Sequence, residues 1–159
     1  MSKTILSHLS KTGLDSSGNF FFQKSLYNPN MLEKIAFRIG DLIHHMEYNI
    51  IVAADPEATA LASLLSIIER VPWVQYDGSN SYFISNEEDE PFATNALVIS
   101  LVCKDKAKKE IEITKTIKVA GIVYLVNTEA NVEELFGNST RIIYLTTLTS
   151  IQSFLTHRR

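Results

Sequence analysis

Two short segments of this chain combine residue types that can bind an anion. The first is Asp55-Pro56-Glu57-Ala58-Thr59, a turn that leads into an apolar helical pattern. The amides of a helix's first turn have no partner within the helix and attract negative charge. We interpret this segment as a ligand loop whose amides and Thr59 hydroxyl face an anion. The alternative is an ordinary helix start, with Pro56 in the first turn and Glu57 complementing the helix dipole.

The second segment has the densest positive charge in the sequence. Its charged residues are Lys104, Asp105, Lys106, Lys108 and Lys109. Lysine acts as a point charge on phosphate, and lysines at a helix start oppose the helix dipole unless an anion compensates. We therefore predict that Lys104, Asp105 and Lys106 contribute to a site for a phosphate-containing small molecule. A solvated charged loop is the alternative.

Other reactive residues indicate neither a metal site nor a nucleophile. His44 and His45 are neighbours that point about 100° apart on a helix, which disfavours a shared metal. Cys103 follows an apolar run and has no histidine nearby in the sequence, so we interpret it as a small buried residue. The acidic run 87–90 lacks the spacing of a calcium loop. We predict no metal ligand and assign no catalytic residue.

Composition limits the class of protein. The chain has 159 residues, a net charge of −3, 45% apolar residues and one cysteine. This length suits one domain, and a single cysteine excludes an intrachain disulfide. The acidic balance argues against nucleic-acid binding. Neither a signal peptide nor an apolar run of about 18 residues is present, so we expect no membrane association and a cytoplasmic location.

Strands and helices alternate along the chain. Apolar residues recur at helical spacing from Met31 to Met46, and a second helix is expected from the turn at 55–57 through Arg70. Its inward residues are predicted to be Ala60, Leu61, Leu64, Leu65 and Ile68. Short apolar runs typical of buried strands lie at 50–54, 72–76, 96–102, 122–126 and 141–145. Shorter elements are expected as helices at 2–12, 131–136 and 150–159 and as strands at 20–22 and 82–84.

Residues 104–119 admit two interpretations. Asp105 suits a helix cap, yet Ile111, Ile113, Ile117 and Val119 fall at the even spacings of a strand. With either outcome, the order of elements predicts an α/β fold with a mainly parallel open sheet flanked by helices. Ligands of such sheets bind beyond the carboxyl ends of the strands. The turn after Ala54 and the segment after Val102 are therefore the places to expect a site.

This order of elements resembles the type I phosphoribosyltransferases, and the orotate phosphoribosyltransferases in particular. The resemblance rests on the layout of residues 14–46, on the strand and loop at 50–62, and on the strands 96–102 and 121–127. It implies a single phosphoribosyltransferase-like domain over 1–159, in which residues 1–30 form a small hood-like part. It also implies a pyrophosphate contact at the 55–59 loop and a homodimer.

The sequence departs from the family's pattern in three places. Ser100 and Leu101 stand where the family has two adjacent acids, which hold the ribose hydroxyls and help retain magnesium. Residues 103–109 replace a phosphate loop rich in threonine and glycine, and contain neither. Residues 76–95 replace a mobile basic catalytic loop, yet contain no lysine or arginine. An acidic loop repels a diphosphate rather than neutralising it.

We therefore predict a phosphoribosyltransferase-like protein that has lost phosphoribosyl transfer and acts in binding a small anionic or nucleotide-like ligand, or in regulation. One alternative is an active orotate phosphoribosyltransferase-like enzyme with a divergent phosphate loop. In that case Asp105 replaces the acid pair, and magnesium is required; otherwise no cofactor is predicted. The other alternative is a pure protein-interaction module, because a fold alone does not fix a function.

Overall fold

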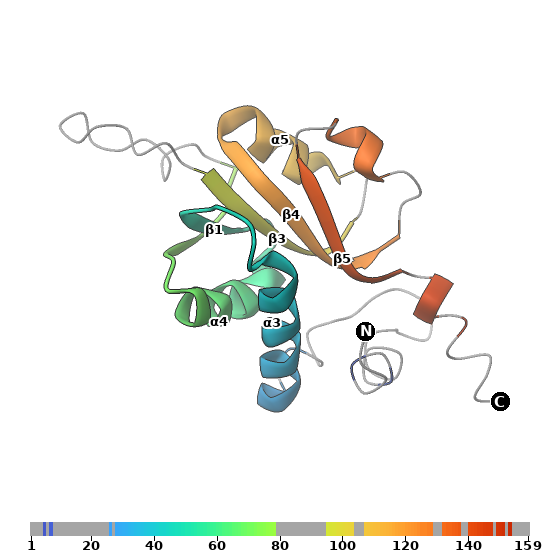
Figure 1. The fold of residues 1–159 in the computed structure, drawn as a ribbon. Coiled ribbons are helices and arrows are strands. Elements are labelled where there is room, and N and C mark those ends of the chain that lie inside the picture. Colours follow the sequence, from blue (N-terminus) through green and yellow to red (C-terminus); the bar gives the residue numbers. More distant parts are fainter. Residues whose placement is uncertain are drawn as a thin grey trace.

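The computed structural model describes residues 5, 7, 26, 28–78, 95–103, 107–128, 132–137, 140–147, 149–151 and 153. Its centre is a parallel sheet in the order β2-β1-β3-β4-β5 (Figure 1). The strands are β1 (Ile50–Ala53), β2 (Trp73–Gln75), β3 (Asn95–Val102), β4 (Lys118–Asn127) and β5 (Arg141–Thr147). Every neighbouring pair of these strands is parallel. The predicted α/β class and mainly parallel open sheet are confirmed.

Helices cover both faces of the sheet. The helical elements are α3 (Pro29–Ile43), η1 (Pro56–Ala58), α4 (Thr59–Glu69), α5 (Lys108–Thr116) and η3 (Val132–Leu135). Figure 1 shows α3 and α4 on one face and α5 with η3 on the other. No helix among the described residues is both long and apolar enough to cross a bilayer.

Alternate strand residues supply the two core layers, because successive side chains of a strand point to opposite faces. On the α3 and α4 side the core takes Ile51, Ala53, Leu97, Ile99, Leu101, Val123 and Leu125. On the α5 side it takes Val52, Ala54, Ala96, Val98, Ile122 and Tyr124, together with Ile113 of α5. The strands are thus apolar on both faces, as a sheet covered by two helical layers requires.

The helix predicted from Met31 begins at Pro29 and ends at Ile43. Its start is fixed by Asn28, whose side chain accepts a hydrogen bond from the amide of Met31 at 3.2 Å. Proline suits the first turn because its missing N–H has no partner there in any helix. The predicted spacing is confirmed by the buried residues Met31, Ile35, Ala36, Ile39 and Ile43.

The inward face predicted for the second helix needs one correction. Ala60 is exposed, and Ala62 is buried with Leu61 and Leu65. Leu64 and Ile68 are partly buried against the same core. The helix is apolar on nearly all sides, so hydropathy alone did not fix which stripe faces the sheet.

Both interpretations of residues 104–119 apply, to different parts of the segment. Residues 108–116 form α5, and Lys118 begins β4. The residue at the N-cap of α5 is Ala107, with φ of 53°, while Asp105 lies outside the described residues. The even spacing of Ile111, Ile113, Ile117 and Val119 wrongly suggested one strand, because these residues lie on both sides of the boundary between α5 and β4.

Several other predictions fall where the structure describes little or nothing. The strands at 20–22 and 82–84 and the acidic run 87–90 lie outside the described residues, as does most of the hood-like part at 1–30. Of the helices expected near the two ends, helical conformation is described at residues 5, 7, 149–151 and 153.

Candidate functional site

The strand order places the carboxyl ends of β1 and β3 side by side. Ala53 of β1 pairs with Ile99 of β3, so the residues that follow them lie at the same edge. From β1 the chain passes outward to β2, whereas β3 leads to β4 on the other side. Such a reversal opens a crevice in α/β sheets and is their usual ligand site. Asp55, which follows β1, and Lys109, which follows β3 in the chain, meet at this edge.

Asp55 is bound to β3. Its Oδ2 accepts hydrogen bonds from the Ser100 hydroxyl at 2.8 Å and the Leu101 amide at 3.4 Å. Its Oδ1 lies 3.4 Å from Nζ of Lys109, in the first turn of α5. The carboxylate makes no capping hydrogen bond to the helix that follows it. Asp55 therefore joins three elements, a role that neither interpretation of the loop anticipated.

The rest of the loop has the features of an ordinary helix start. Pro56 stands in the first turn, and Glu57 is the acidic residue beside the amides. The Thr59 hydroxyl donates to the carbonyl of Pro56 at 2.7 Å, so its proton is directed at the backbone. Ala58 is fully buried and packs into the core. Ligand binding at residues 55–59 stays a prediction.

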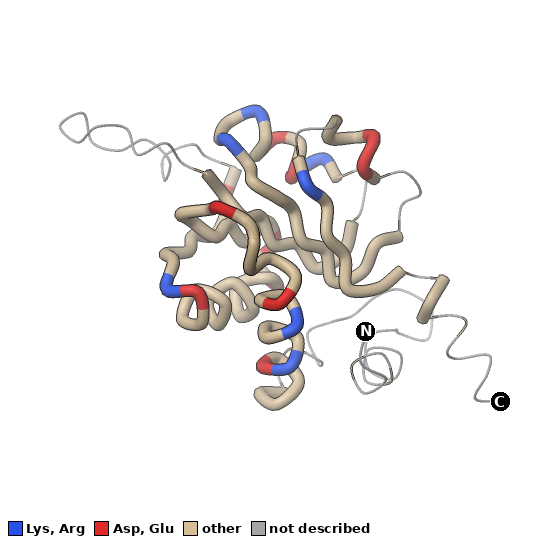
Figure 2. Tube along the Cα trace, in the orientation of Figure 1, with Lys and Arg blue, Asp and Glu red and all other residues tan. Residues whose placement is uncertain are grey.

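The lysine segment is described only from Ala107 onward. Lys104, Asp105 and Lys106 lie outside the described residues, and their predicted contact with a phosphate group stays a prediction. Lys108 and Lys109 are exposed on the first turn of α5. Figure 2 shows charged residues on the helices, on the segments that connect helices and strands, and at the beginnings of strands, while the strand interiors have none.

Glu110 is also on α5, but it is buried, with 4% of its surface exposed, whereas Lys108 and Lys109 are exposed. Burial raises the pKa of its carboxyl above the ordinary value of 4.5. A hydrogen bond with Ser100 opposes that rise, and the negative charge of Asp55 adds to it. Two carboxyl groups thus converge on the single hydroxyl of Ser100.

Tyr124 completes this cluster from β4, opposite Ser100 in the strand register. Its ring is fully buried, and its hydroxyl has no hydrogen bond of standard geometry to any described residue. Burial, reinforced by Glu110 and the adjacent Cys103, raises the pKa of the phenol above its usual value of 10. We call Asp55, Ser100, Lys109, Glu110 and Tyr124 the edge cluster.

The structure also describes the surroundings of Cys103, His44 and His45. The Cys103 side chain is fully buried, and the backbone carbonyl of this residue accepts a hydrogen bond from Thr128. The ring of His44 lies against the carbonyl of Asp41, and the ring of His45 against the guanidinium of Arg141. Within the described ranges, no group of three or more His, Cys, Asp or Glu side chains is placed to hold a metal ion.

Sequence reasoning missed Glu110 and Tyr124. A signal for Glu110 was present, because it precedes the apolar Ile113 by three positions and so shares its buried helix face. Tyr124 stands in an unbroken apolar run, where nothing marks its hydroxyl as reaching a polar cluster.

No protein-family model matches this sequence, and neither does any curated protein. Solved structures with the same fold were found. Leishmania donovani UMP synthase superposes with a TM-score of 0.74 at 13% identity over 98% of this chain, which spans 38% of that chain's length. The orotate phosphoribosyltransferase of Aeropyrum pernix gives 0.66 at 18% identity, with 96% of this chain and 99% of that one covered.

The adenine phosphoribosyltransferase of Thermoanaerobacter pseudethanolicus gives a TM-score of 0.63 at 10% identity, with 90% of this chain and 99% of that one covered. The chain therefore has the type I phosphoribosyltransferase fold. Identity this low establishes the fold alone, because one fold hosts many functions.

Proposed function

We propose that this chain keeps the phosphoribosyltransferase fold, has lost phosphoribosyl transfer, and binds a small phosphate-containing or nucleotide-like ligand as a binding or regulatory protein. In an open α/β sheet of this kind, ligands bind at the carboxyl edge where the strand order reverses, which here is the edge of β1 and β3. What can bind there depends on the residues at that edge.

The observation that supports the loss of transfer is the position of Asp55. Ser100 and Leu101 stand where the resemblance expects two adjacent acids. Here the Ser100 hydroxyl and the Leu101 amide both donate to the Asp55 carboxylate. The end of β3 therefore offers hydrogen-bond donors that are already used, rather than carboxylates that accept from ribose hydroxyls.

The charges at the start of α5 support the class of ligand. Lys108 and Lys109 oppose the positive end of the helix dipole, which an anion would compensate. The side chain of Lys109 is 55% exposed, and its partner Asp55 is 3.4 Å away. An ion pair this exposed contributes at most about 1 kcal/mol. An anionic ligand can therefore displace Asp55 from Lys109 at small cost, and the nearby Lys104 and Lys106 would add charge.

Thermal unfolding with added ligand tests this proposal. The probes are inorganic phosphate, nucleoside monophosphates, orotate and phosphoribosyl diphosphate, each with and without magnesium. A ligand at about a hundredfold over its Kd should add roughly 2.7 kcal/mol of stability. We expect such a stabilisation from a phosphate-containing probe without a magnesium requirement and without turnover. Lys104→Ala and Lys106→Ala should weaken it, whereas Lys115→Ala, at the opposite end of α5, should not.

Other outcomes would favour the alternatives. Magnesium-dependent stabilisation by phosphoribosyl diphosphate, together with turnover that Asp105→Asn abolishes, would establish an active enzyme. No stabilisation by any probe would exclude the ligand and favour an interaction module.

We also propose a homodimer and a cytoplasmic location. Two large apolar side chains are exposed on the helices of one sheet face, Phe37 at 54% on α3 and Ile67 at 72% on α4. Light scattering should give about twice the 17.9 kDa mass of one chain. Ile67→Lys should reduce this to one chain, whereas Leu135→Lys, on the opposite face, should not. A wild-type mass of 17.9 kDa would contradict the dimer.

A further inference from the structure

The edge cluster contains an unequal pair of carboxyl groups. Asp55 and Glu110 both face the Ser100 hydroxyl, but the Asp55 side chain is 24% exposed and Glu110 is 4% exposed. In the structure the Ser100 proton is donated to Asp55 at 2.8 Å. One hydroxyl has one proton, so it satisfies both groups only if Glu110 is protonated and donates its own proton to Ser100 Oγ.

We propose that Asp55, Ser100 and Glu110 form a proton-dependent clamp that holds the 55–59 loop against β3 when Glu110 is protonated and releases it when Glu110 is ionised. Asp55 is the group that loses its hydrogen bond to Ser100, because its side chain is partly exposed to solvent and Glu110 is buried. An ionised Glu110 cannot reach water from its buried position, so it accepts the hydrogen bond of the Ser100 hydroxyl in place of Asp55. The carboxylate of Asp55 then turns to solvent, and the Leu101 amide loses its acceptor.

The charged groups that face Glu110 act in opposite directions on its pKa. Asp55 adds negative charge from the β1 side, and Lys109 on the same helix adds positive charge. Tyr124 on β4 lies close enough to Glu110 for the carboxyl group to raise the pKa of the phenol. Burial raises the pKa of Glu110, so the clamp changes state at a pH above the ordinary value of 4.5.

The Leu101 amide reports the clamp directly, because its proton is donated to Asp55. We would measure its hydrogen exchange by NMR as a function of pH, corrected for the intrinsic rate. Wild-type protection should fall about tenfold for each pH unit as the pH rises through the raised pKa of Glu110. Glu110→Gln, which keeps a neutral donor at every pH, should hold the protection constant across this range. Ser100→Ala should leave the amide weakly protected at every pH.

Glu112→Gln is the matched control, because Glu112 is an exposed carboxylate on the same helix. It should exchange like the wild type. The clamp is wrong if Glu110→Gln shows the wild-type pH profile, or if Ser100→Ala retains full protection. This measurement needs no ligand, so its failure is distinguishable from failure of the proposed function.

Discussion

At the scale of single residues, the carboxyl edge of β1 and β3 is marked by polar side chains that are buried in the fold. Ser100, Glu110 and Tyr124 are each at most 4% exposed. Polar groups this buried are costly unless they are hydrogen-bonded. Ser100 and Glu110 satisfy this condition with each other and with Asp55. The Tyr124 hydroxyl has no hydrogen bond of standard geometry and has only the weak partner Cys103, so the cost of burying it is the easiest to measure.

Tyr124→Phe should keep stability constant or raise it by about 1–3 kcal/mol, because it removes a buried hydroxyl that has no hydrogen bond of standard geometry. Urea denaturation at fixed pH measures the change. Tyr144→Phe serves as a control, because Tyr144 is 41% exposed and its hydroxyl should contribute little. A clear loss of stability in Tyr124→Phe would instead reveal a bonded hydroxyl.

Glu110→Gln should be more stable than the wild type at neutral pH, with an advantage that vanishes in acid. A raised pKa means that the folded state binds the proton more tightly than the unfolded state. The stability due to this proton is full below about pH 4.5 and is lost as the pH rises through the raised pKa. A tenfold difference in proton affinity between the folded and unfolded states corresponds to about 1.4 kcal/mol. Denaturant titrations at about pH 4.5 and about pH 8 measure the difference, and an equal gap at both would contradict it.

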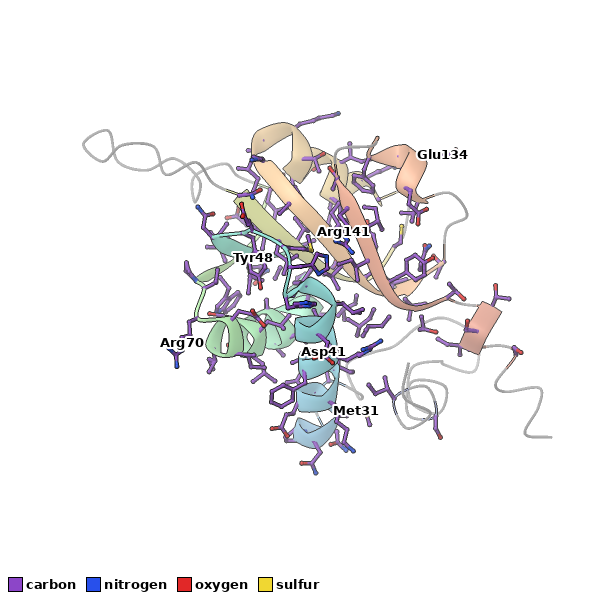
Figure 3. All side chains as sticks on the ribbon, viewed as in Figure 1. Met31, Asp41, Tyr48, Arg70, Glu134 and Arg141 are labelled. Carbon is purple, nitrogen blue, oxygen red and sulfur yellow. The ribbon has the colours of Figure 1, made fainter. Side chains whose placement is uncertain are left out.

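At the scale of elements, the ends of helices show where local sequence rules are obeyed and where they are not. Asn28 caps α3 as those rules expect. α4 instead is followed directly by Arg70, its C-cap residue, which adopts a left-handed backbone conformation with φ of 57°. Glycine is the residue best suited to that conformation, since any Cβ is strained there. Figure 3 shows Arg70 pointing away from the protein body.

Arg70→Gly should therefore stabilise the protein, by roughly 1 kcal/mol, because it relieves the left-handed strain and removes no buried contact. The change is read as a rise in Tm. Arg38→Gly provides the opposite control, since position 38 is inside α3, where glycine should cost about 1 kcal/mol. A fall in Tm for Arg70→Gly would show that its side chain stabilises the end of the helix.

At the scale of the whole molecule, Gly121 lies where the segment after α3 and strand β5 both approach β4 closely. The β3–β4 register shifts between Ala96 and Leu97, immediately before Gly121 pairs with Leu97. A Cβ at Gly121 would overlap the methyl group of Met46 and lie 3.1 Å from the carbonyl of Arg141 on β5. Three separate parts of the chain therefore meet where no side chain fits.

Gly121→Ala should destabilise the protein by about 1–3 kcal/mol through this crowding. Denaturant unfolding of the single variant and of the double variant with Met46→Ala measures the coupling. Met46→Ala should recover part of the loss, because it removes the side chain that a Cβ would meet. Strict additivity of the two changes would show that Met46 is not the obstacle.

The sequence alone determined the elements and the class of fold, because hydrophobic period is a local property. The strand runs at 50–54, 96–102 and 122–126 and the apolar face of α3 were all readable from it, as was the resemblance to phosphoribosyltransferases. It failed at 104–119 and at Ala60, where one pattern crossed a boundary or an apolar helix offered several faces.

Only the tertiary structure decided the chemistry of the edge. Asp55 and Ser100 are 45 residues apart, and parallel pairing of β1 with β3 brings them together. Glu110 joins them because α5 packs on the same face of the sheet, against β4. Such contacts depend on the order and register of strands, which no local pattern encodes. The sequence therefore predicted where a site should lie, whereas the fold determined which side chains meet there and how they hydrogen-bond to one another.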